Sequence, residues 1–201
     1  MINLEPVTLT GKIVCLEPLS EAHIPDLAVA GAYELIWQHM RYGMVTTEEK
    51  MRAWVLDMLA RQERGGDLPF AVYHLQDGRA IGATRYMNVN VSERGLEIGG
   101  TWYTPSFQGA GVNTDAIYLL LKYAVEELGC IRVQIKTDNR NIQSQRSIER
   151  MGAVKEGILR NHIICLDGSY RDSIFYSIIE SEWPEIKSKL EDRLNSNYGG
   201  R

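Results

Sequence analysis

The sequence lacks the cysteine patterns that mark whole classes of protein. Its three cysteines, Cys15, Cys130 and Cys165, stand far apart and without the CxxC or Cys/His spacing of a metal site or a redox pair. A disulfide framework and a zinc site are therefore not expected. Each thiol is expected to pack as a small apolar group in a reducing compartment.

Clustered basic residues and long apolar runs are also missing. The chain has 22 Lys and Arg against 26 Asp and Glu, and its cations do not gather as they do in proteins that hold a phosphate backbone. Nucleic acid is thus excluded as the main partner. No window approaches 18 apolar residues, and the first residues lack a basic region followed by an apolar run. We expect a cytoplasmic protein with neither an export signal nor a membrane span.

Length and composition permit one hydrophobic core. Hydrophobic residues make up 44% of 201 residues, and no linker-like stretch divides the chain. The simplest expectation is one domain over 1–201, with a core at about 10–180 and a C-terminal helix and tail at 181–201. A chain of this length buries about 70% of its unfolded surface, which is enough without metals or disulfides.

The first half of the chain is predicted to form a strand, a helix and an antiparallel meander. Thr47 followed by two glutamates indicates a helix start, and Asp77-Gly78 indicates a hairpin turn. The expected elements are a strand at 13–19 ending near Pro18, helical material from Ser20, a helix at 47–64, and strands at 69–75, 80–89 and 96–103.

The second half alternates between helices and strands. We expect a helix at 112–128, a strand at 131–138, a helix at 141–151, strands at 154–166 and 170–179 joined by Asp167-Gly168, and a short last helix with a frayed polar tail. A strand, helix and strand form a right-handed crossover, which makes the 96–103 and 131–138 strands parallel. The fold class is α/β (α+β), with a mixed, mostly antiparallel sheet of about seven strands.

The segment QGAGVN at 108–113 lies between a strand and a helix. Gly109 and Gly111 let the backbone come close to a ligand, and several N–H groups and the helix dipole favour an anion such as a pyrophosphate. A purely structural turn explains the bare pattern equally well. The segment is neither GxxxxGK[ST] nor a full GxGxxG, which argues against a nucleoside-triphosphate or dinucleotide site.

This segment resembles the pyrophosphate loop of the GNAT acetyltransferases, which has the form Q/R-x-x-G-x-G/A. Gln108 and Gly111 match, whereas Asn113 stands where the family usually has Gly or Ala. The resemblance covers about 10–180 and continues in N-x-x-S at 141–144 and RMGAVKEG at 150–157. The runs EIGGTWYTPSFQGAGVNTDA and DGSYRDSIFYSII are most similar to the RimJ/RimL type, which acetylates ribosomal-protein N-termini and includes enzymes acting on antibiotics and small amines.

The resemblance implies a site for acetyl-CoA. In the family, two parallel strands splay apart and the pantetheine inserts between them like an extra strand. Gly99-Gly100 has the composition of the accompanying bulge, although these glycines could also relieve packing. The implied cofactor-binding residues are Trp102 and Tyr103 through their N–H groups, and Gln108, Gly109, Ala110, Gly111, Val112, Asn113, Asn141 and Ser144.

The implied reaction is direct attack of an unprotonated amine on the thioester. It needs a base, polarisation of the carbonyl and a proton for the thiolate. Glu97 stands where family members carry an acidic base, and its period-two spacing places it on one face with Gly99, Thr101 and Tyr103. An exposed glutamate paired across the sheet is the alternative for Glu97.

Two further residues are candidates for proton transfer. Ser144 matches the serine that is proposed to protonate the thiolate in RimL-type enzymes, and Ile148 replaces the tyrosine that other members use. Helix capping is the alternative for Ser144 and for Asn141. His162 lies near a second candidate base of these enzymes, with a structural histidine as its alternative.

Other polar residues are expected to have no catalytic role. His23, His39 and His74 have no partner pattern, so no metal site is expected. Arg171 and Asp172 are adjacent in a strand and point to opposite faces, which favours ordinary surface charge over a mutual ion pair.

The aromatic residues are expected mainly in the core. Trp37, Trp54, Trp102 and Trp183 provide most of this mass. The resemblance assigns 33–45, YELIWQHMRYGMV, to the wall of the acceptor site, with core packing as the alternative.

The leading expectation is an N-acetyltransferase that moves acetyl from acetyl-CoA to a protein N-terminus or a small amine. The alternatives are a non-catalytic acyl-CoA-binding regulatory module of the same fold and a protein-interaction domain without a ligand. Acceptor and oligomeric state stay open, with a homodimer among the possibilities.

Overall fold

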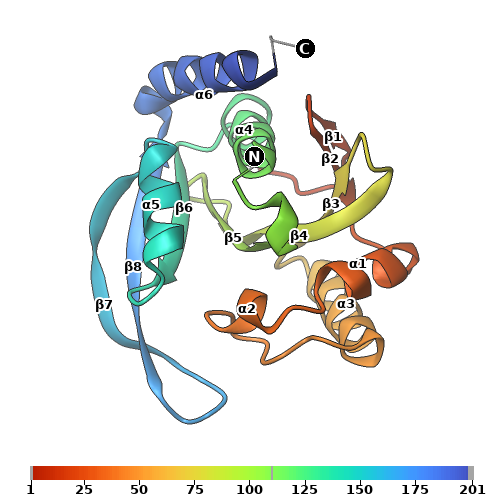
Figure 1. Ribbon diagram of the computed structural model, residues 1–201. Helices are drawn as coiled ribbons and strands as arrows, with labels where there is room; N and C mark the ends of the chain where they lie inside the picture. Colours follow the sequence, from red (N-terminus) through yellow and green to blue (C-terminus); the bar gives the residue numbers. More distant parts are fainter. Residues whose placement is uncertain (1, 110, 199–201) are drawn as a thin grey trace.

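The computed structural model describes residues 2–109 and 111–198 and shows one twisted sheet with helices on both faces (Figure 1). The strand order is β1-β2-β3-β4-β5-β6-β8-β7. The strands are β1 (Leu9–Thr10), β2 (Val14–Pro18), β3 (Leu68–His74), β4 (Arg79–Asn90), β5 (Gly95–Tyr103), β6 (Arg132–Asp138), β7 (Val154–Ile164) and β8 (Tyr170–Ile179). The helices are α1 (Ile24–Ala30), α2 (Glu34–Trp37), α3 (Glu48–Glu63), α4 (Val112–Lys122), α5 (Ile142–Arg150) and α6 (Trp183–Tyr198).

The expected fold class and order of elements are confirmed, with two differences. The two-residue strand β1 adds an eighth strand, which is too short to leave a pattern in the sequence. The last helix, α6, continues to Tyr198 instead of fraying after Leu194. Leu190 and Leu194 are buried, and Asn195 accepts a hydrogen bond from Lys12, so contacts with the rest of the chain hold these turns.

The parallel pair β5 and β6 is joined only at its beginning. Pairing runs from Gly95 opposite Arg132 to Ile98 opposite Ile135, and all other neighbouring strands are antiparallel. Both strands continue beyond Ile98 and Ile135 without pairing to each other. The edge of β5 that faces β6 therefore offers backbone groups with no strand partner.

The expected bulge in β5 is confirmed at Gly100. Between two regular pairs with β4, one β4 residue, Thr84, faces two β5 residues, Gly100 and Thr101. Gly100 has a φ of 65°, a left-handed conformation that glycine adopts without strain. The hydroxyl groups of Thr84 and Thr101 lie 2.8 Å apart and hydrogen-bond across the bulge.

This extra residue reverses the alternation of side chains along the rest of β5. Before the bulge, Leu96 and Ile98 point to the face covered by α4; after it, Tyr103 joins that layer and Trp102 points to the opposite face. The expectation that Glu97 shares a face with Tyr103 is therefore wrong, because strict period two holds only for an unbroken ladder.

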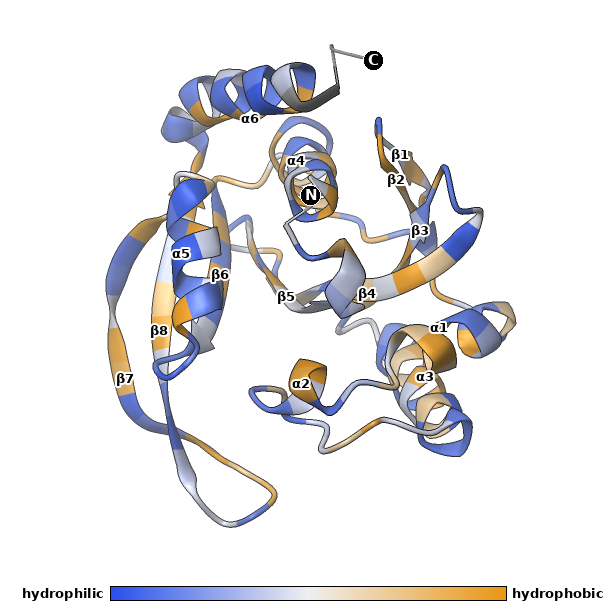
Figure 2. Cartoon of the chain, viewed as in Figure 1, coloured by the Kyte–Doolittle hydropathy of each residue, from blue (hydrophilic) through white to orange (hydrophobic). Residues whose placement is uncertain are grey.

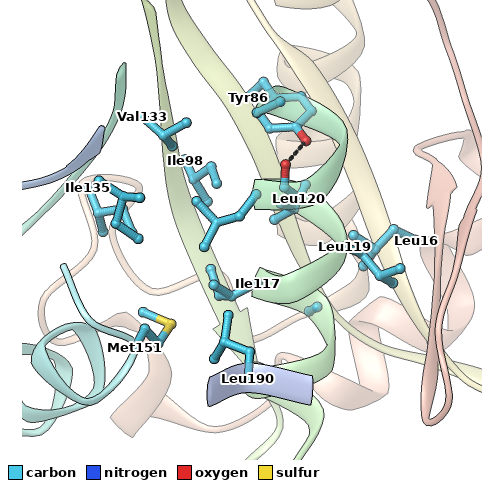
Figure 3. Close-up of a cluster of buried hydrophobic side chains, with 14 of the residues drawn as sticks. Leu16, Tyr86, Ile98, Ile117, Leu119, Leu120, Val133, Ile135, Met151 and Leu190 are labelled. Carbon is cyan, nitrogen blue, oxygen red and sulfur yellow. Dashed lines mark hydrogen bonds between the residues drawn. The ribbon is translucent and has the colours of Figure 1, made fainter. Parts of the chain in front are cut away.

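A hydrophobic core fills each face of the sheet. On one face, α4, α5 and α6 pack over the strands, and the hydroxyl of buried Tyr86 donates to the carbonyl of Leu120 at 2.6 Å (Figure 3). On the other face, α1 and α3 cover a cluster in which Trp102 lies between Trp37 and Trp54, with ring centroids 5.1 and 5.9 Å away. Hydrophobic stretches of α1 and α2 are visible on this side (Figure 2). The expectation that the tryptophans are core residues is confirmed.

Among residues 2–109 and 111–198, no helix combines the length and the apolar character that crossing a bilayer requires.

Candidate active site

A cleft of about 960 Å³ lies where β5 and β6 part. Its wall comes from α2 and the loop after it, from strands β4, β5, β6 and β8, from the segment after β5, from the start of α4 and from α5, with one residue each from α3 and α6. The cleft brings together most of the residues that the sequence singled out: Glu97, Trp102, Tyr103, Gln108, Gly109, Gly111, Asn113, Asn141 and Ser144. Val112 and His162 are outside its wall, and Ala110 is outside the described residues.

The loop before α4 presents an open stretch of backbone. Gly109 and Gly111 have φ values of 83° and 80°, which glycine alone adopts readily. A Cβ added to Gly109 would meet nothing within 4 Å, so the backbone there is open to a ligand. Gly111 is the N-cap of α4, which places the positive end of the helix dipole at the same point.

Gln108 has a structural role in this loop. Its side-chain amide donates to the carbonyl of Tyr103 at 3.3 Å, and its Oε1 accepts from Gln143 at 3.1 Å. These two bonds connect the loop with the end of β5 and with α5. The side chain therefore fixes the shape of the loop.

Asn113, the residue that departs from the family pattern, joins three elements. Its Oδ1 accepts from the hydroxyl of Tyr103 at 3.2 Å, and its Nδ2 donates to Oγ of Ser147 at 3.1 Å. Burial raises the pKa of Tyr103 far above its ordinary value, so its hydroxyl keeps the proton that it donates. The neighbouring Val112 side chain is fully buried in the core, so only its backbone can contact a ligand.

Asn141 and Ser144, at the start of α5, were each expected either to cap the helix or to act in the site. Asn141 is the N-cap, and its Oδ1 accepts from the Ser144 N–H at 3.0 Å. The Ser144 hydroxyl lines the cleft and, among described residues, has no hydrogen-bond partner. Capping thus accounts for the side chain of Asn141 but not for that of Ser144. Ile148, where other members have tyrosine, is buried in the core.

Glu97 is buried and held by three donors. It is 2% exposed, and its Oε2 accepts from Asn88 and Gln134 at 2.9 Å and from Lys136 Nζ at 2.8 Å. A Cβ on Gly99 would come within 3.2 Å of Oε1, so the missing side chain leaves space beside this oxygen. The alternative was an exposed glutamate paired across the sheet. Glu97 is not exposed, but it does pair across the sheet with Lys136 of β6.

His162 lies on β7 and is turned toward β8. Its Nδ1 is 3.0 Å from Oγ of Ser173, and its ring packs edge-on against Phe175 at 5.2 Å. Burial lowers the pKa of His162 below its ordinary value, and the charges of Lys136 and Arg171 lower it further. The imidazole is therefore mainly neutral at pH 7, outside the wall of the cleft.

The segment 33–45 forms the cleft wall on the α3 side of the sheet. Cleft-lining residues run from Leu35 to Tyr42, except for Trp37, which is buried beneath them. The Tyr42 hydroxyl stands over the bulge, 3.1 Å from where a Cβ of Gly100 would be. The segment thus lines the cleft, and its role as the wall of an acceptor site stays a prediction.

Arg171 is not a surface charge, contrary to the sequence-based expectation. It is 8% exposed, lines the cleft, and donates to the carbonyl of His39 at 3.2 Å, because the loop after α2 covers the start of β8. Asp172 pairs instead with the backbone of the β7 bulge and accepts from the Asn161 N–H at 2.7 Å.

Sequence reasoning missed two cations of the cleft, Arg85, which is buried, and Lys136, whose side chain is 13% exposed. Arg85 is 6% exposed and lies 3.3 Å from Asp67, and Lys136 pairs with Glu97. A signal existed for both: Arg85 interrupts the apolar run AIGATRYM, and Lys136 interrupts the β-branched strand IRVQIKTD. A lone cation in an apolar strand requires a buried partner.

The remaining histidines pair with carboxylates. His23 lies 3.1 Å from Glu17, His74 lies 3.2 Å from Asp77, and Nδ1 of His39 lies 3.9 Å from Oδ2 of Asp138. No cluster that could hold a metal ion occurs in the part of the chain that the structure describes.

Comparisons with known proteins agree on one family. A family model described as "Acetyltransferase (GNAT) domain" matches residues 14–154. YdaF of Bacillus subtilis, provisionally named a ribosomal N-acetyltransferase, is 35% identical over 54% of this chain and 58% of its own length.

Two solved structures place the likeness in three dimensions. A provisionally named acetyltransferase from T. thermophilus is 35% identical, with a TM-score of 0.86 over 95% of this chain and 98% of the other. Mycobacterium smegmatis RimJ, solved with CoA-disulfide, is 21% identical, with a TM-score of 0.76 over 94% and 95% of the two chains, and it shows the fold alone.

Proposed function

Because the chain belongs to the GNAT acetyltransferase family, we propose that it transfers the acetyl group of acetyl-CoA to a primary amine. The acceptor is a protein N-terminus or a small molecule. One observation carries the proposal: a single cleft joins a glycine loop at a helix N-terminus, an unpaired strand edge and a buried carboxylate.

The residues present fit acetyl-CoA. The open backbone at Gly109 and the N-terminus of α4 suit a pyrophosphate, and the free edge of β5 beyond Ile98 suits an extended chain with amide groups. Bound there, acetyl-CoA would supply the acetyl thioester. The bound cofactor in the RimJ structure, which has this fold, supports the assignment.

Three groups of this chain would serve the reaction. Oε1 of Glu97, beside the space left by Gly99, takes the proton of the attacking amine, directly or through water. Backbone N–H groups near Trp102 and Tyr103, after the bulge, stabilise the negative charge on the carbonyl oxygen. The amine nitrogen would bond to the carbonyl carbon as the carbon–sulfur bond breaks, and the hydroxyl of Ser144, a residue of the cleft wall, would give the departing thiolate a proton. Ser144 would regain a proton from solvent water, and Glu97 would release to water the proton it took from the amine, so the protons balance.

Two finer assignments concern the acceptor and a second candidate base. The provisional name of YdaF favours acceptors of the ribosomal-protein type, and with them a place in the cytoplasm. His162 is the second candidate base: it is neutral at pH 7, but it lies outside the cleft wall and would need a water to reach it.

A second function, a non-catalytic acyl-CoA-binding module, is favoured by one observation. The carboxylate of Glu97 is held by Lys136 and two amides, as a structural ion pair would be.

Calorimetry with acetyl-CoA and a thiol-release assay test these proposals together. We expect acetyl-CoA to bind and thiol to appear with at least one member of a panel of peptides, polyamines and aminoglycosides. Binding without turnover of any amine would support the module, and absence of binding would contradict both functions.

A further inference from the structure

Cations dominate the wall of the cleft. Eight of its described lining residues are arginine or lysine, and Glu97 is the one carboxylate among them, although the whole chain has a formal charge of −4. A cleft that concentrates one sign of charge attracts a ligand of the opposite sign.

Two of the eight belong to the end of the cleft near α4 and α5. Arg150 ends α5 and Arg193 is on α6, and Arg193 donates to the carbonyl of Arg150. They lie on the side of the glycine loop, where the phosphates of acetyl-CoA would bind. Their charge is therefore explained by the proposed donor.

Four others have a carboxylate of their own. The pairs are Arg61 with Asp57 at 2.9 Å, Arg85 with Asp67 at 3.3 Å, Lys136 with Glu97 at 2.8 Å, and Arg140 with Asp138 at 2.7 Å. Within these pairs the charges cancel. These four cations therefore need no anionic ligand to balance their charge.

Arg41 and Arg171 are left over. Arg41 is exposed and has neither a hydrogen bond nor an ion pair within the described ranges. Arg171 is 8% exposed, and its buried Nε has no hydrogen-bond partner. The carboxylate nearest to Arg171 is Asp138, whose Oδ2 is 3.9 Å away and is already bound by Arg140.

These two arginines share one region of the cleft. The loop that carries Arg41 meets the turn between β7 and β8, since a Cβ on Gly43 would lie 3.1 Å from Leu166 Cδ1. Arg171 also donates to the carbonyl of His39, two residues before Arg41, at 3.2 Å. Burial lowers the pKa of Arg171, the carboxylate of Asp138 raises it, and the charge of Arg41 lowers it, in keeping with two cations on the same side of the cleft. In the ladder of β7 and β8, Arg171 is opposite Ile163, the neighbour of His162, so the two arginines lie on the side of this second candidate base.

We propose that Arg41 and Arg171 form an anion subsite for the acceptor, so that the amine acetylated by this protein belongs to a molecule carrying a carboxylate or phosphate near that amine. This inference rests on the proposed function. Two guanidinium groups can hold either anion with paired, charge-assisted hydrogen bonds, and an anion removes the repulsion between them. The free Nε of Arg171 supplies a buried donor that no described protein group uses.

Matched acceptors test the subsite. Each pair differs in one charged group: serine against serinamide, phosphoserine amide against serinamide, and a peptide beginning Ser-Glu against one beginning Ser-Gln. We expect kcat/KM for the anionic member to be at least about tenfold higher, which corresponds to about 1.4 kcal/mol and is within reach of one charge-assisted hydrogen bond. The first two pairs distinguish carboxylate from phosphate, and the third distinguishes a peptide from a free amino acid.

Variants separate the subsite from a general charge effect. In Arg41→Gln the preference for the anionic member should fall roughly tenfold, mainly through KM, and in Arg41→Glu it should disappear or reverse. Arg160→Gln, which removes an exposed charge on β7 outside the cleft wall, should leave the preference unchanged. Arg41 is exposed and makes no hydrogen bond or ion pair in the part of the chain that the structure describes, so these variants should fold as the parent does.

The outcomes distinguish this inference from the proposed function. If acetyl-CoA binds but neutral acceptors are used as well as anionic ones, or if Arg41→Glu keeps the preference, the subsite is wrong and the proposed function stands. If acetyl-CoA does not bind, the proposed function fails. If no amine is turned over, calorimetric binding of the same pairs to the CoA-saturated protein decides: equal affinities within each pair overturn the subsite, and tighter binding of the anionic members supports it.

Discussion

The two ends of the cleft are built in different ways. At the α4 end, the features come from one short stretch of chain: two glycines with positive φ, the helix that follows, and Asn113, which joins them to α5. At the other end, the loop after α2, strand β4 and strand β8 each contribute side chains that are distant in sequence. The first end depends on backbone geometry and the second on how separate segments pack, so the two should respond differently to mutation.

The largest effect is expected from Glu97→Gln. If Glu97 accepts the proton of the amine, kcat should fall about 10²–10⁴-fold while acetyl-CoA affinity changes little, because general base catalysis contributes that much to rate. Steady-state kinetics with calorimetry of acetyl-CoA binding measures both.

A matched double variant controls for Lys136, the lysine that Glu97→Gln leaves unpaired. Glu97→Gln with Lys136→Met removes both charges of the pair. If activity returns in the double variant, the loss came from the stranded lysine and Glu97 is not the base. Equal loss in both variants supports proton transfer.

Gly111→Val should act at the opposite end and on binding. A β-branched residue at a φ of 80° costs about 1–3 kcal/mol of backbone strain, so acetyl-CoA affinity should fall roughly 10- to 100-fold. Calorimetry measures the affinity. Gly168→Val, at a φ of 81° in the turn between β7 and β8, carries the same strain away from the loop. An equal loss of affinity in Gly168→Val would contradict the separation of the two ends.

Ser144→Ala is expected to lower kcat by roughly three- to tenfold, the contribution of one hydrogen bond, since water can replace the hydroxyl as proton donor. Acetyl-CoA affinity should stay close to that of the parent. Ser147→Ala is the comparison, because it removes a hydroxyl from the same helix but one that holds Asn113. A larger effect on affinity than on kcat is expected there, and the same profile in both variants would argue against a proton donor.

The smallest effect is expected from thiol modification. Burial raises the pKa of Cys130 to about 11, so at pH 8 this thiol stays protonated and unreactive while Cys165, half-buried near the turn between β7 and β8, reacts first. Alkylation of Cys165 by iodoacetamide should slightly raise the acceptor KM and leave acetyl-CoA binding unchanged. Peptide mass mapping identifies the modified residue, and early modification of Cys130 would contradict its burial.

The same contrast explains how much of the protein could be predicted from the sequence. Helices with a clear repeat of apolar residues, such as α3 with its Thr47 cap, could be predicted from the local sequence, and so could the glycine loop. The bulge at Gly99-Gly100 was visible in composition. Its effect on the face of Tyr103 was not, because the number of inserted residues depends on the partner strand.

The contacts of the other cleft end could not be predicted from the sequence. Whether Arg171 is buried depends on a loop more than 120 residues earlier in the chain, whose carbonyl at His39 accepts its hydrogen bond. No local period contains such information. A lone cation in an apolar strand, such as Arg85, indicates only that a partner exists, and Asp67 is found only when the fold is known.

The single residue inserted at Gly100 decides to which face of the sheet each later side chain of β5 points. With the insertion, the indole of Trp102 completes the aromatic cluster under one end of the cleft, and the phenol of Tyr103 reaches Asn113 at the other. Removing one residue there would exchange the two rings and dismantle both ends together. In a lineage of such proteins, this strand can vary in side chains far more freely than in length.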